Sequence, residues 1–335
     1  MADLVLPAAI GLAPVLCFLA ALVAIDSYRL LRLRTVVAVL VAGALVAVAC
    51  YHANAWLMAA TRLELAPYAR YVAPLLEELM KAAVVGALVH THRIGFLVDG
   101  AILGFAVGAG FGVVENLHYQ RIVPDADVGT WIVRGFGTAM MHGGATAIYA
   151  MATLALLPRV RPRLLAFAPG FATAVLLHSA FNHMFLSPKL STLVVLLGIP
   201  PLILLVFRRG QAAVARWLGQ GFDGDAERLA LLLSGQLPDS PLGRYLATLR
   251  SRFAGPVLAD LLCYLRLSTE LALRAKGMVM MRENGFDVPV DDATRAKLAE
   301  LRYLERSIGR AGLLALRPVL AQRHEELWQL RLLAQ

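Results

Sequence analysis

The stretch Tyr71-Val-Ala-Pro-Leu-Leu-Glu77-Glu78-Leu-Met-Lys81 places two adjacent glutamates and a lysine inside an apolar run. Ionisable groups are costly inside a bilayer, and those found there usually face the interior of a helix bundle or a wet cavity. On a helix, Lys81 lies one turn after both glutamates and can pair with at least one of them. The stretch therefore predicts a helix whose polar side chains point into a bundle.

The composition of the chain indicates a polytopic membrane protein. Of its 335 residues, 59% are hydrophobic and 16% are charged, whereas roughly a quarter are charged in soluble domains. The charged residues are unevenly distributed along the chain. Positions 1–207 contain 9 acidic and 13 basic residues, and the shorter stretch 208–335 contains 14 acidic and 19 basic residues. We therefore expect a transmembrane domain over 1–207 and a cytosolic α-helical domain over 208–335.

Seven stretches are apolar enough to cross a bilayer, which takes about 20 residues of helix. They are 4–25, 35–60, 71–89, 94–117, 131–157, 164–186 and 190–207. The fold class that follows is all-α, a bundle of about seven transmembrane helices with a helical C-terminal region. The fourth stretch carries a small residue at every fourth position, which lets a neighbouring helix approach closely. These residues are Gly100, Gly104, Gly108 and Gly112.

Basic residues in the loops predict the orientation of the helices. Cytoplasmic loops carry an excess of lysine and arginine. In this chain the first, third and fifth loops between the predicted spans, together with the start of the tail, contain more arginine in total than the second, fourth and sixth loops. The arginines of the first set are Arg29, Arg32, Arg34, Arg93, Arg159, Arg161, Arg163, Arg208 and Arg209. We expect a protein of the cell membrane with the N-terminus outside and the C-terminus in the cytoplasm. The net charge of +9 then reflects orientation and anionic lipid, and we expect no nucleic-acid partner.

Polar side chains lie inside four of the predicted helices. They are Glu77 and Glu78 in the third, Glu115 in the fourth, His142 in the fifth, and His178 and Asn182 in the sixth. At a rise of 1.5 Å per residue, all fall in the outer half of the membrane, although two of the helices run inward and two outward. This shared depth predicts one common site. Asp99 and Arg134, by contrast, are expected near opposite membrane faces.

Carboxylates and imidazoles together form a ligand set of the kind that binds zinc and leaves a position for water. Bound zinc activates that water and polarises a carbonyl, and a further glutamate can serve as general base. Other protease signatures are absent, since the sequence has no HExxH and no GxSG motif. An aspartyl dyad is also excluded, because Asp99 is the only aspartate well inside a predicted span.

Four motifs follow one another on successive predicted helices. They are Glu77-Glu78-Leu-Met-Lys81, Phe111-Gly-Val-Val-Glu115, the segment around His142, and His178-Ser-Ala-Phe-Asn182. In this order they resemble the PrsW family of intramembrane proteases, relatives of the CAAX prenyl protease and bacteriocin-processing superfamily. The resemblance covers about residues 70–185. Glu115 stands where the CAAX proteases have a histidine, which favours the PrsW family.

The resemblance implies an intramembrane endopeptidase that cleaves membrane-anchored proteins of the anti-sigma-factor kind, and hence a role in signalling. Glu77 and Glu78 would activate water and bind the metal, if one is used, with Glu78 favoured as the base. Lys81 would keep both ionised. Asn182 would donate to the oxyanion. The expected ligands of Zn²⁺ are Glu115, His142 and His178. The resemblance also allows attack by water that glutamate activates without a metal.

Two other functions are compatible with the residues. Buried carboxylates and histidines also form proton relays, as in a proton- or cation-coupled transporter, although no inverted repeat is evident between the two halves. A non-catalytic scaffold or receptor that signals through 208–335 is the third. The expected partners are the lipid bilayer, a membrane-anchored substrate, and a second copy or a cytosolic protein at the C-terminal region.

Overall fold

The computed structural model describes residues 2–286, 288–320 and 324–334, and these form helices joined by turns and loops, with no strand. This confirms the predicted all-α fold class. The chain divides into two compact units, Met1–Gln211 and Ala212–Gln335. One long helix, α9 (Pro188–Leu233), belongs to both units, so the helix expected to end at 207 continues past that position.

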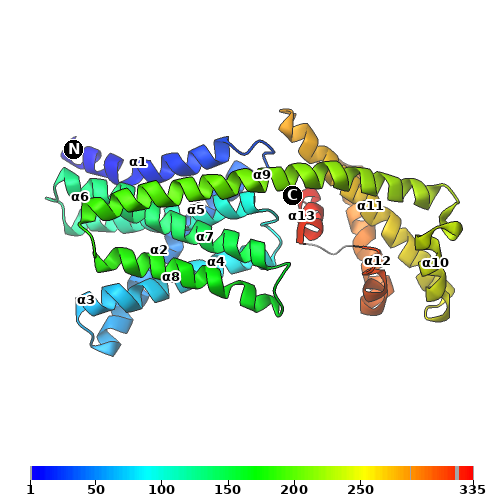
Figure 1. Cartoon of the computed structure of the whole chain (residues 1–335), viewed down its shortest axis with the longest axis horizontal. Helices are drawn as coiled ribbons and strands as arrows, with labels where there is room; N and C mark the ends of the chain where they lie inside the picture. The colour runs from blue at the N-terminus through cyan, green and yellow to red at the C-terminus, as the bar shows by residue number, and fades with distance from the viewer. Residues whose placement is uncertain (1, 287, 321–323, 335) are drawn as a thin grey trace. The chain divides into compact units, whose positions relative to one another are not determined.

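The first unit is a bundle of helices (Figure 1). Its long helices are α1 (Ala2–Ala24), α2 (Leu33–Thr61), α4 (Ala73–His90), α5 (Leu97–Ile122), α7 (Met140–Leu156), α8 (Ala168–His183) and the first part of α9. Short helices α3 (Leu65–Pro67) and α6 (Val128–Ile132) lead into two π-helical segments. These segments are Tyr68–Val72, which precedes α4, and Val133–Ala139, which precedes α7.

Six helical stretches of the described chain are long and apolar enough to cross a membrane. They are Leu6–Ala24, Leu33–Thr61, Leu97–Ile122, Val128–Leu156, Arg163–His183 and Pro188–Leu233. The remaining predicted span corresponds to α4, an 18-residue helix that carries Glu77, Glu78 and Lys81 and is therefore less apolar. Its charged face is covered by α2, α5, α7 and α8. The protein is thus a multi-pass membrane protein.

Helix α5 is the centre of this bundle and packs in close contact with both α7 and α2. The small-residue stripe faces α7, since a Cβ atom at Gly104 would lie 2.9 Å from the Cα atom of Ala147. On the side facing α2, a Cβ atom at Gly110 would overlap the carbonyl of Leu40. Asp99 caps the start of α5, because its Oδ2 atom accepts the N–H of Gly95 at 2.7 Å. The backbone of α5 is therefore fixed on both sides.

The second unit contains the end of α9 together with α10 (Pro241–Thr248), α11 (Gly255–Glu283), α12 (Asp292–Leu316) and α13 (His324–Leu333). Leucines of α11 and α12 dominate its apolar core, among them Leu261, Leu265 and Leu301. Asp291 caps α12 by accepting the N–H of Thr294 at 2.7 Å. The hydroxyl and amide of Thr294 hold the pKa of Asp291 below its ordinary value.

The close packing of α5 predicts different effects for two glycine substitutions. We expect Gly108→Ala to destabilise the protein by about 1–3 kcal/mol, the usual range for overpacking, because the new methyl group would overlap the backbone carbonyl of His142. Gly198→Ala in α9 is the matched control, since its Cβ position has no described atom within 4 Å apart from its chain neighbours and the nearby backbone of its own helix. We expect the control to be neutral or stabilising by about 0.5–1 kcal/mol. Unfolding of both variants in mixed micelles measures the difference, and equal effects would contradict this packing.

Candidate functional site

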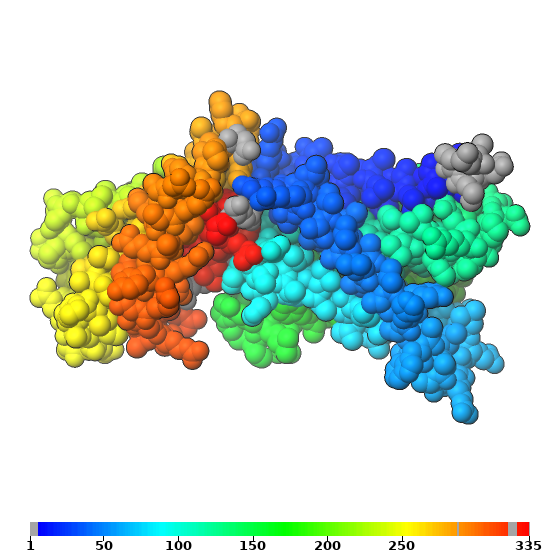
Figure 2. Space-filling view, turned by 180° about the vertical axis from the view of Figure 1, so that it is seen from behind, coloured from blue at the N-terminus to red at the C-terminus, as the bar shows by residue number. Residues whose placement is uncertain are grey.

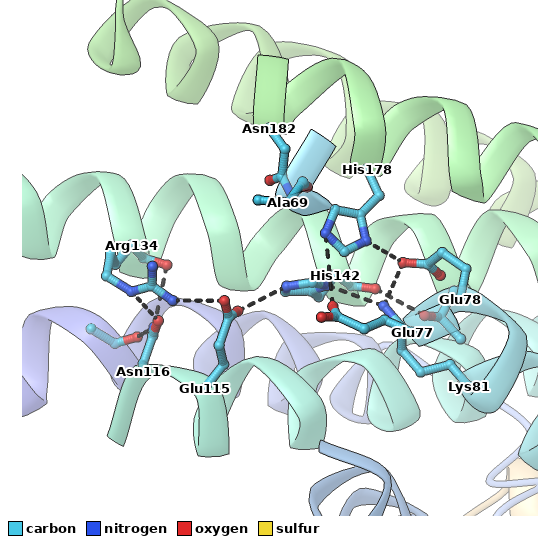
Figure 3. Close-up of polar contacts among 12 residues, drawn as sticks. Ala69, Glu77, Glu78, Lys81, Glu115, Asn116, Arg134, His142, His178 and Asn182 are labelled. Atoms are coloured by element: carbon cyan, nitrogen blue, oxygen red, sulfur yellow. Dashed lines mark hydrogen bonds and ion pairs between the residues drawn. The ribbon is translucent and has the colours of Figure 1, made fainter. Parts of the chain in front are cut away.

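Four helices of the first unit bring their polar side chains to one place (Figure 3). Helix α4 contributes Glu77, Glu78 and Lys81, and α5, α7 and α8 contribute one residue each. The latter three are Glu115, His142 and His178, which contact one another or the α4 residues. The structure thus brings together six of the seven residues that the sequence pointed to, and it places Asn182 at the edge of the group.

Glu78 is the most deeply buried carboxylate of the cluster, with 2% of its surface exposed. Its Oε1 atom accepts a hydrogen bond from Lys81 Nζ at 2.5 Å and lies 2.9 Å from Nδ1 of His178. An ionised carboxylate can only accept, so His178 donates through Nδ1. The other ring nitrogen, Nε2, is then free of a proton in the neutral ring, and it lies 3.9 Å from Oε2 of Glu77.

Lys81 connects Glu78 to His142. Its Nζ atom lies 3.0 Å from Nδ1 of His142 and 4.6 Å from the centre of the Phe111 ring. An ammonium group can only donate, so Nδ1 of His142 accepts. The proton of a neutral His142 ring is then on Nε2, which lies 2.9 Å from Oε2 of Glu115. The hydrogen-bond chain therefore continues from α4 through α7 to α5.

Arg134, which we expected near a membrane face, extends this chain beyond Glu115. Its Nη2 atom lies 3.2 Å from Oε1 of Glu115, and its guanidinium group stacks 3.5 Å from the centre of the Tyr119 ring. Its Nε atom donates to Oδ1 of Asn116 at 2.9 Å. The only hint of this interaction in the sequence is Asn116, a polar residue directly after Glu115 in the same predicted span. Arg134 thus neutralises Glu115 inside the bundle.

Glu77 is held by two residues that sequence reasoning missed. Asn54 of α2 donates from Nδ2 to Oε1 of Glu77 at 2.9 Å. The hydroxyl group of Tyr68 in turn donates to Oδ1 of Asn54 at 2.8 Å. Both lie near the ends of predicted spans, where polar side chains are common, so no sequence pattern distinguished them. Their hydrogen bonds fix the orientation of the Glu77 carboxylate.

Asn182, which we expected to donate to the oxyanion, is hydrogen-bonded to the backbone before α4. Its Nδ2 atom donates to the carbonyl of Ala69 at 2.9 Å, and Ser179 donates to the carbonyl of Arg70 at 2.6 Å. Pro74 explains why these carbonyls need outside partners, because it has no N–H to offer to a carbonyl four or five residues earlier. Helix α8 therefore supplies hydrogen-bond donors to two carbonyls of the π-helical segment Tyr68–Val72. The side-chain amide nitrogen of Asn182 is used for one of these bonds.

Three of these residues could hold a metal ion. Ligand atoms of Glu77, His142 and His178 all lie within 4.8 Å of one another. One carboxylate and two imidazoles are a donor set that catalytic zinc sites use. Glu78 accepts from Nδ1 of His178, which is the arrangement that orients a ligating histidine. Glu115, which we expected among the ligands, instead lies against Nε2 of His142. The donor set fits a zinc-type metal.

The contact between Lys81 and His142 limits how a metal can bind. Coordination through Nε2 of His142 requires the ring proton on Nδ1. That protonated Nδ1 cannot accept from a charged Lys81, which lies 3.0 Å away. Metal coordination through Nε2 and the Lys81–His142 hydrogen bond therefore exclude one another while Lys81 is charged.

The buried Lys81–Glu78 pair predicts a large effect on stability. We expect Lys81→Met to destabilise the protein by about 3–5 kcal/mol, because it leaves a buried carboxylate without its partner. The double variant Glu78→Gln/Lys81→Met should recover part of that loss. Arg295→Met is the matched control, since Arg295 pairs with Asp292 at a surface position where its side chain is 64% exposed, and such pairs contribute about 0–1 kcal/mol. Equal shifts of the unfolding midpoint for Lys81→Met and Arg295→Met would contradict this description.

Comparison with known proteins identifies the family. A family model described as PrsW family intramembrane metalloprotease matches residues 32–207, which is more than half of the 335 residues. The matched region includes every residue of the cluster, and it confirms the resemblance seen in the motifs. Neither the curated proteins nor the solved structures with which we compared the chain contain a significant match. The chain belongs to the PrsW family of intramembrane metalloproteases and is an intramembrane protease.

Proposed function

We propose that the chain hydrolyses membrane-anchored regulatory proteins of the anti-sigma-factor kind, with water that is activated beside Glu77, Glu115 and His178. The observation that carries this proposal is the group of three ligand atoms from Glu77, His142 and His178 within 4.8 Å. A cavity of about 770 Å³ adjoins the group and is lined by Glu77, Glu115 and His178. Family membership favours proteolysis over the transporter and scaffold functions that the sequence left open.

In this proposal the metal is bound by Glu77, His142 and His178, and its binding replaces the Lys81–His142 hydrogen bond, because Nδ1 of His142 then carries the ring proton. A zinc ion held there would polarise the scissile carbonyl and supply activated water. Glu78 holds His178 in the tautomer whose Nε2 atom is free to coordinate, through the 2.9 Å contact to Nδ1. Lys81 compensates the charge of Glu78. Glu78 therefore orients a ligand and does not reach the substrate, which differs from the role that we expected from the sequence.

Glu115 is the remaining carboxylate of the cluster that lines the cavity, and we assign it as the general base. Its side chain is 28% exposed, whereas that of Glu78 is 2% exposed. Oε2 of Glu115 accepts the proton of the attacking water and later delivers it to the leaving amine. Arg134 holds the carboxylate in place through Oε1. This proposal moves Glu115 from the expected metal ligands to the base and keeps Glu77 for the metal alone.

The proposed orientation places the N-terminus outside the cell and the second unit in the cytoplasm. The arginine-rich loops support it, because cytoplasmic loops carry the excess of basic residues. The cluster would then lie in the outer half of the membrane. Digestion of a C-terminal tag by protease added to intact cells would contradict this orientation.

The assignment of Glu115 predicts a loss of cleavage in a folded protein. We expect Glu115→Gln to lower the rate by about 10²–10⁴-fold, the usual contribution of a general base. Wild type and variant are incubated in proteoliposomes with the membrane proteins of the source cell, and new protein N-termini are identified by mass spectrometry. Glu64→Gln is the control, since Glu64 is exposed and outside the cluster. An absence of new termini with the wild type would overturn the function, and full activity of Glu115→Gln would overturn the base assignment.

The ligand assignment predicts which variants lose metal. We expect purified wild type to hold about one zinc ion per chain, as a catalytic site of this type does. Glu77→Gln and His178→Ala should lose it, whereas Glu115→Gln should retain it. Elemental analysis of the purified proteins measures the zinc content. Loss of zinc from Glu115→Gln with retention in Glu77→Gln would restore the ligand set expected from the sequence. A wild type that cleaves without bound metal would instead indicate water activated by glutamate alone.

A further inference from the structure

We propose that helix α1 takes part in the hydrolytic site, because Asn116 links the backbone of α1 to Arg134 and so to Glu115. Asn116 is then a positioning residue, which affects the reaction only through Arg134 and Glu115. This inference rests on the proposed function, in which Glu115 is the general base. Helix α1 precedes residues 32–207, the region that the family model matches, so family membership assigns it no part in the reaction.

Helix α1 lies directly against the segment that carries Arg134. It packs on α5, on α6 and on the π-helical segment Val133–Ala139. Figures 1 and 2 show it in dark blue beside the blue-green helices that follow α5. The approach is close because position 135 is a glycine, where a Cβ atom would overlap the carbonyl of Ile10. Pro14 has no N–H to donate to that carbonyl, so the usual helical hydrogen bond to it is missing.

The side-chain amide of Asn116 connects α1 to Arg134, and this side chain is completely buried. Its Nδ2 atom donates to the carbonyl of Gly11 at 2.7 Å and to the carbonyl of Arg134 at 3.3 Å. Its Oδ1 atom accepts from Nε of Arg134 at 2.9 Å. An amide oxygen can only accept, so a reversed amide would place Oδ1 against the carbonyl oxygen of Gly11. Helix α1 therefore fixes the direction in which the amide points.

The guanidinium group of Arg134 is held at both ends of its donor set. Figure 3 shows it between Asn116, which binds Nε, and Glu115, whose Oε1 atom lies 3.2 Å from Nη2. The group also stacks 3.5 Å from the centre of the Tyr119 ring. A guanidinium group presents its donors in a rigid fork, so an anchor at Nε sets the direction of Nη2. Without that anchor the group can turn, and the carboxylate of Glu115 loses its fixed donor.

A variant of Asn116 tests whether this chain of contacts supports the reaction. Asn116→Leu keeps nearly the same size and removes both the donor and the acceptor. We expect it to lower kcat by about 10–100-fold, the usual cost of losing a residue that orients a functional group. KM should not change, because Asn116 is buried away from the cavity. The substrate for this assay is a membrane protein that the wild type cleaves in proteoliposomes.

Gln211→Leu is the matched control for this variant. Gln211 of α9 also donates from its side-chain amide to a backbone carbonyl at 2.7 Å, that of Ile25 just after α1. It makes no hydrogen bond to the cluster among the described residues. We expect its kcat and KM to equal those of the wild type. Equal losses in Gln211→Leu and Asn116→Leu would overturn the inference.

A glycine variant tests the part of α1 without a change at Asn116 or Arg134. Gly135→Ala would push α1 away at the carbonyl of Ile10, and we expect kcat to fall by about tenfold, the lower end of the same range. Gly129→Ala is its control, since the nearest atoms to that Cβ position are those of the Asp127 carboxylate at 3.5 Å. A normal kcat for Gly135→Ala would overturn the part assigned to α1. This variant also decides the question if Asn116→Leu does not fold.

Hydrogen exchange at Nε of Arg134 measures the positioning without any cleavage. Nuclear magnetic resonance of micellar protein with isotope-labelled arginine follows this proton, and Arg134→Lys identifies its signal. We expect exchange to be faster by about tenfold in Asn116→Leu than in the wild type, as the loss of a hydrogen bond to a charged group implies. It should be unchanged in Gln211→Leu. Equal rates in the wild type and Asn116→Leu, or faster exchange at all arginines alike, would overturn the inference.

The two measurements separate this inference from the proposed function. Slow exchange that depends on Asn116, in a wild type that cleaves no membrane protein, would keep the positioning and overturn the function. Cleavage at equal rates by the wild type and Asn116→Leu would keep the function and overturn the inference.

Discussion

The ammonium group of Lys81 has no contact with solvent, and its two close partners decide how the bundle is assembled. A buried charge is tolerated only where it is paired and hydrogen-bonded. Glu78 supplies the opposite charge from the same helix, and His142 supplies an acceptor from α7. Because Glu78 also binds His178 and His142 also binds Glu115, this one lysine ties α4 to α5, α7 and α8. The position of each functional group depends on it.

A second constraint comes from backbone and not from charge. Pro74 deprives the preceding turn of an N–H, and the residues before it form a π-helical segment whose carbonyls are bonded by Ser179 and Asn182. The same segment contains Tyr68, which holds Asn54 and through it Glu77. One irregular turn therefore connects α8 to the carboxylate that faces the cavity. Hydrogen bonds that satisfy the backbone inside a membrane can therefore also position a side chain.

The sequence predicted the helices and the gathering of polar residues because both follow from simple periodicities. Hydropathy defines the spans, and a fixed rise per residue makes the depths of Glu78, His142 and His178 comparable. The sequence could not predict the partners of Arg134 or Asn54, because these depend on the rotation of one helix against another. The roles that we propose for Glu77 and Glu115 depend on the same packing, since it decides which carboxylate lies near both histidines.

Helix α2 lines the cavity but carries none of the proposed ligands and not the proposed base. Helix α2 supplies one whole wall of the cavity, but apart from Asn54 it makes no hydrogen bond to the cluster among the described residues. The proposed ligands and base lie on α4, α5, α7 and α8. Sequence change along the wall formed by Ala47, Val48 and Met58 can therefore alter which polypeptides are accepted while the hydrolytic groups stay intact. Such a separation allows one hydrolytic centre to be adapted to new substrates through a single helix.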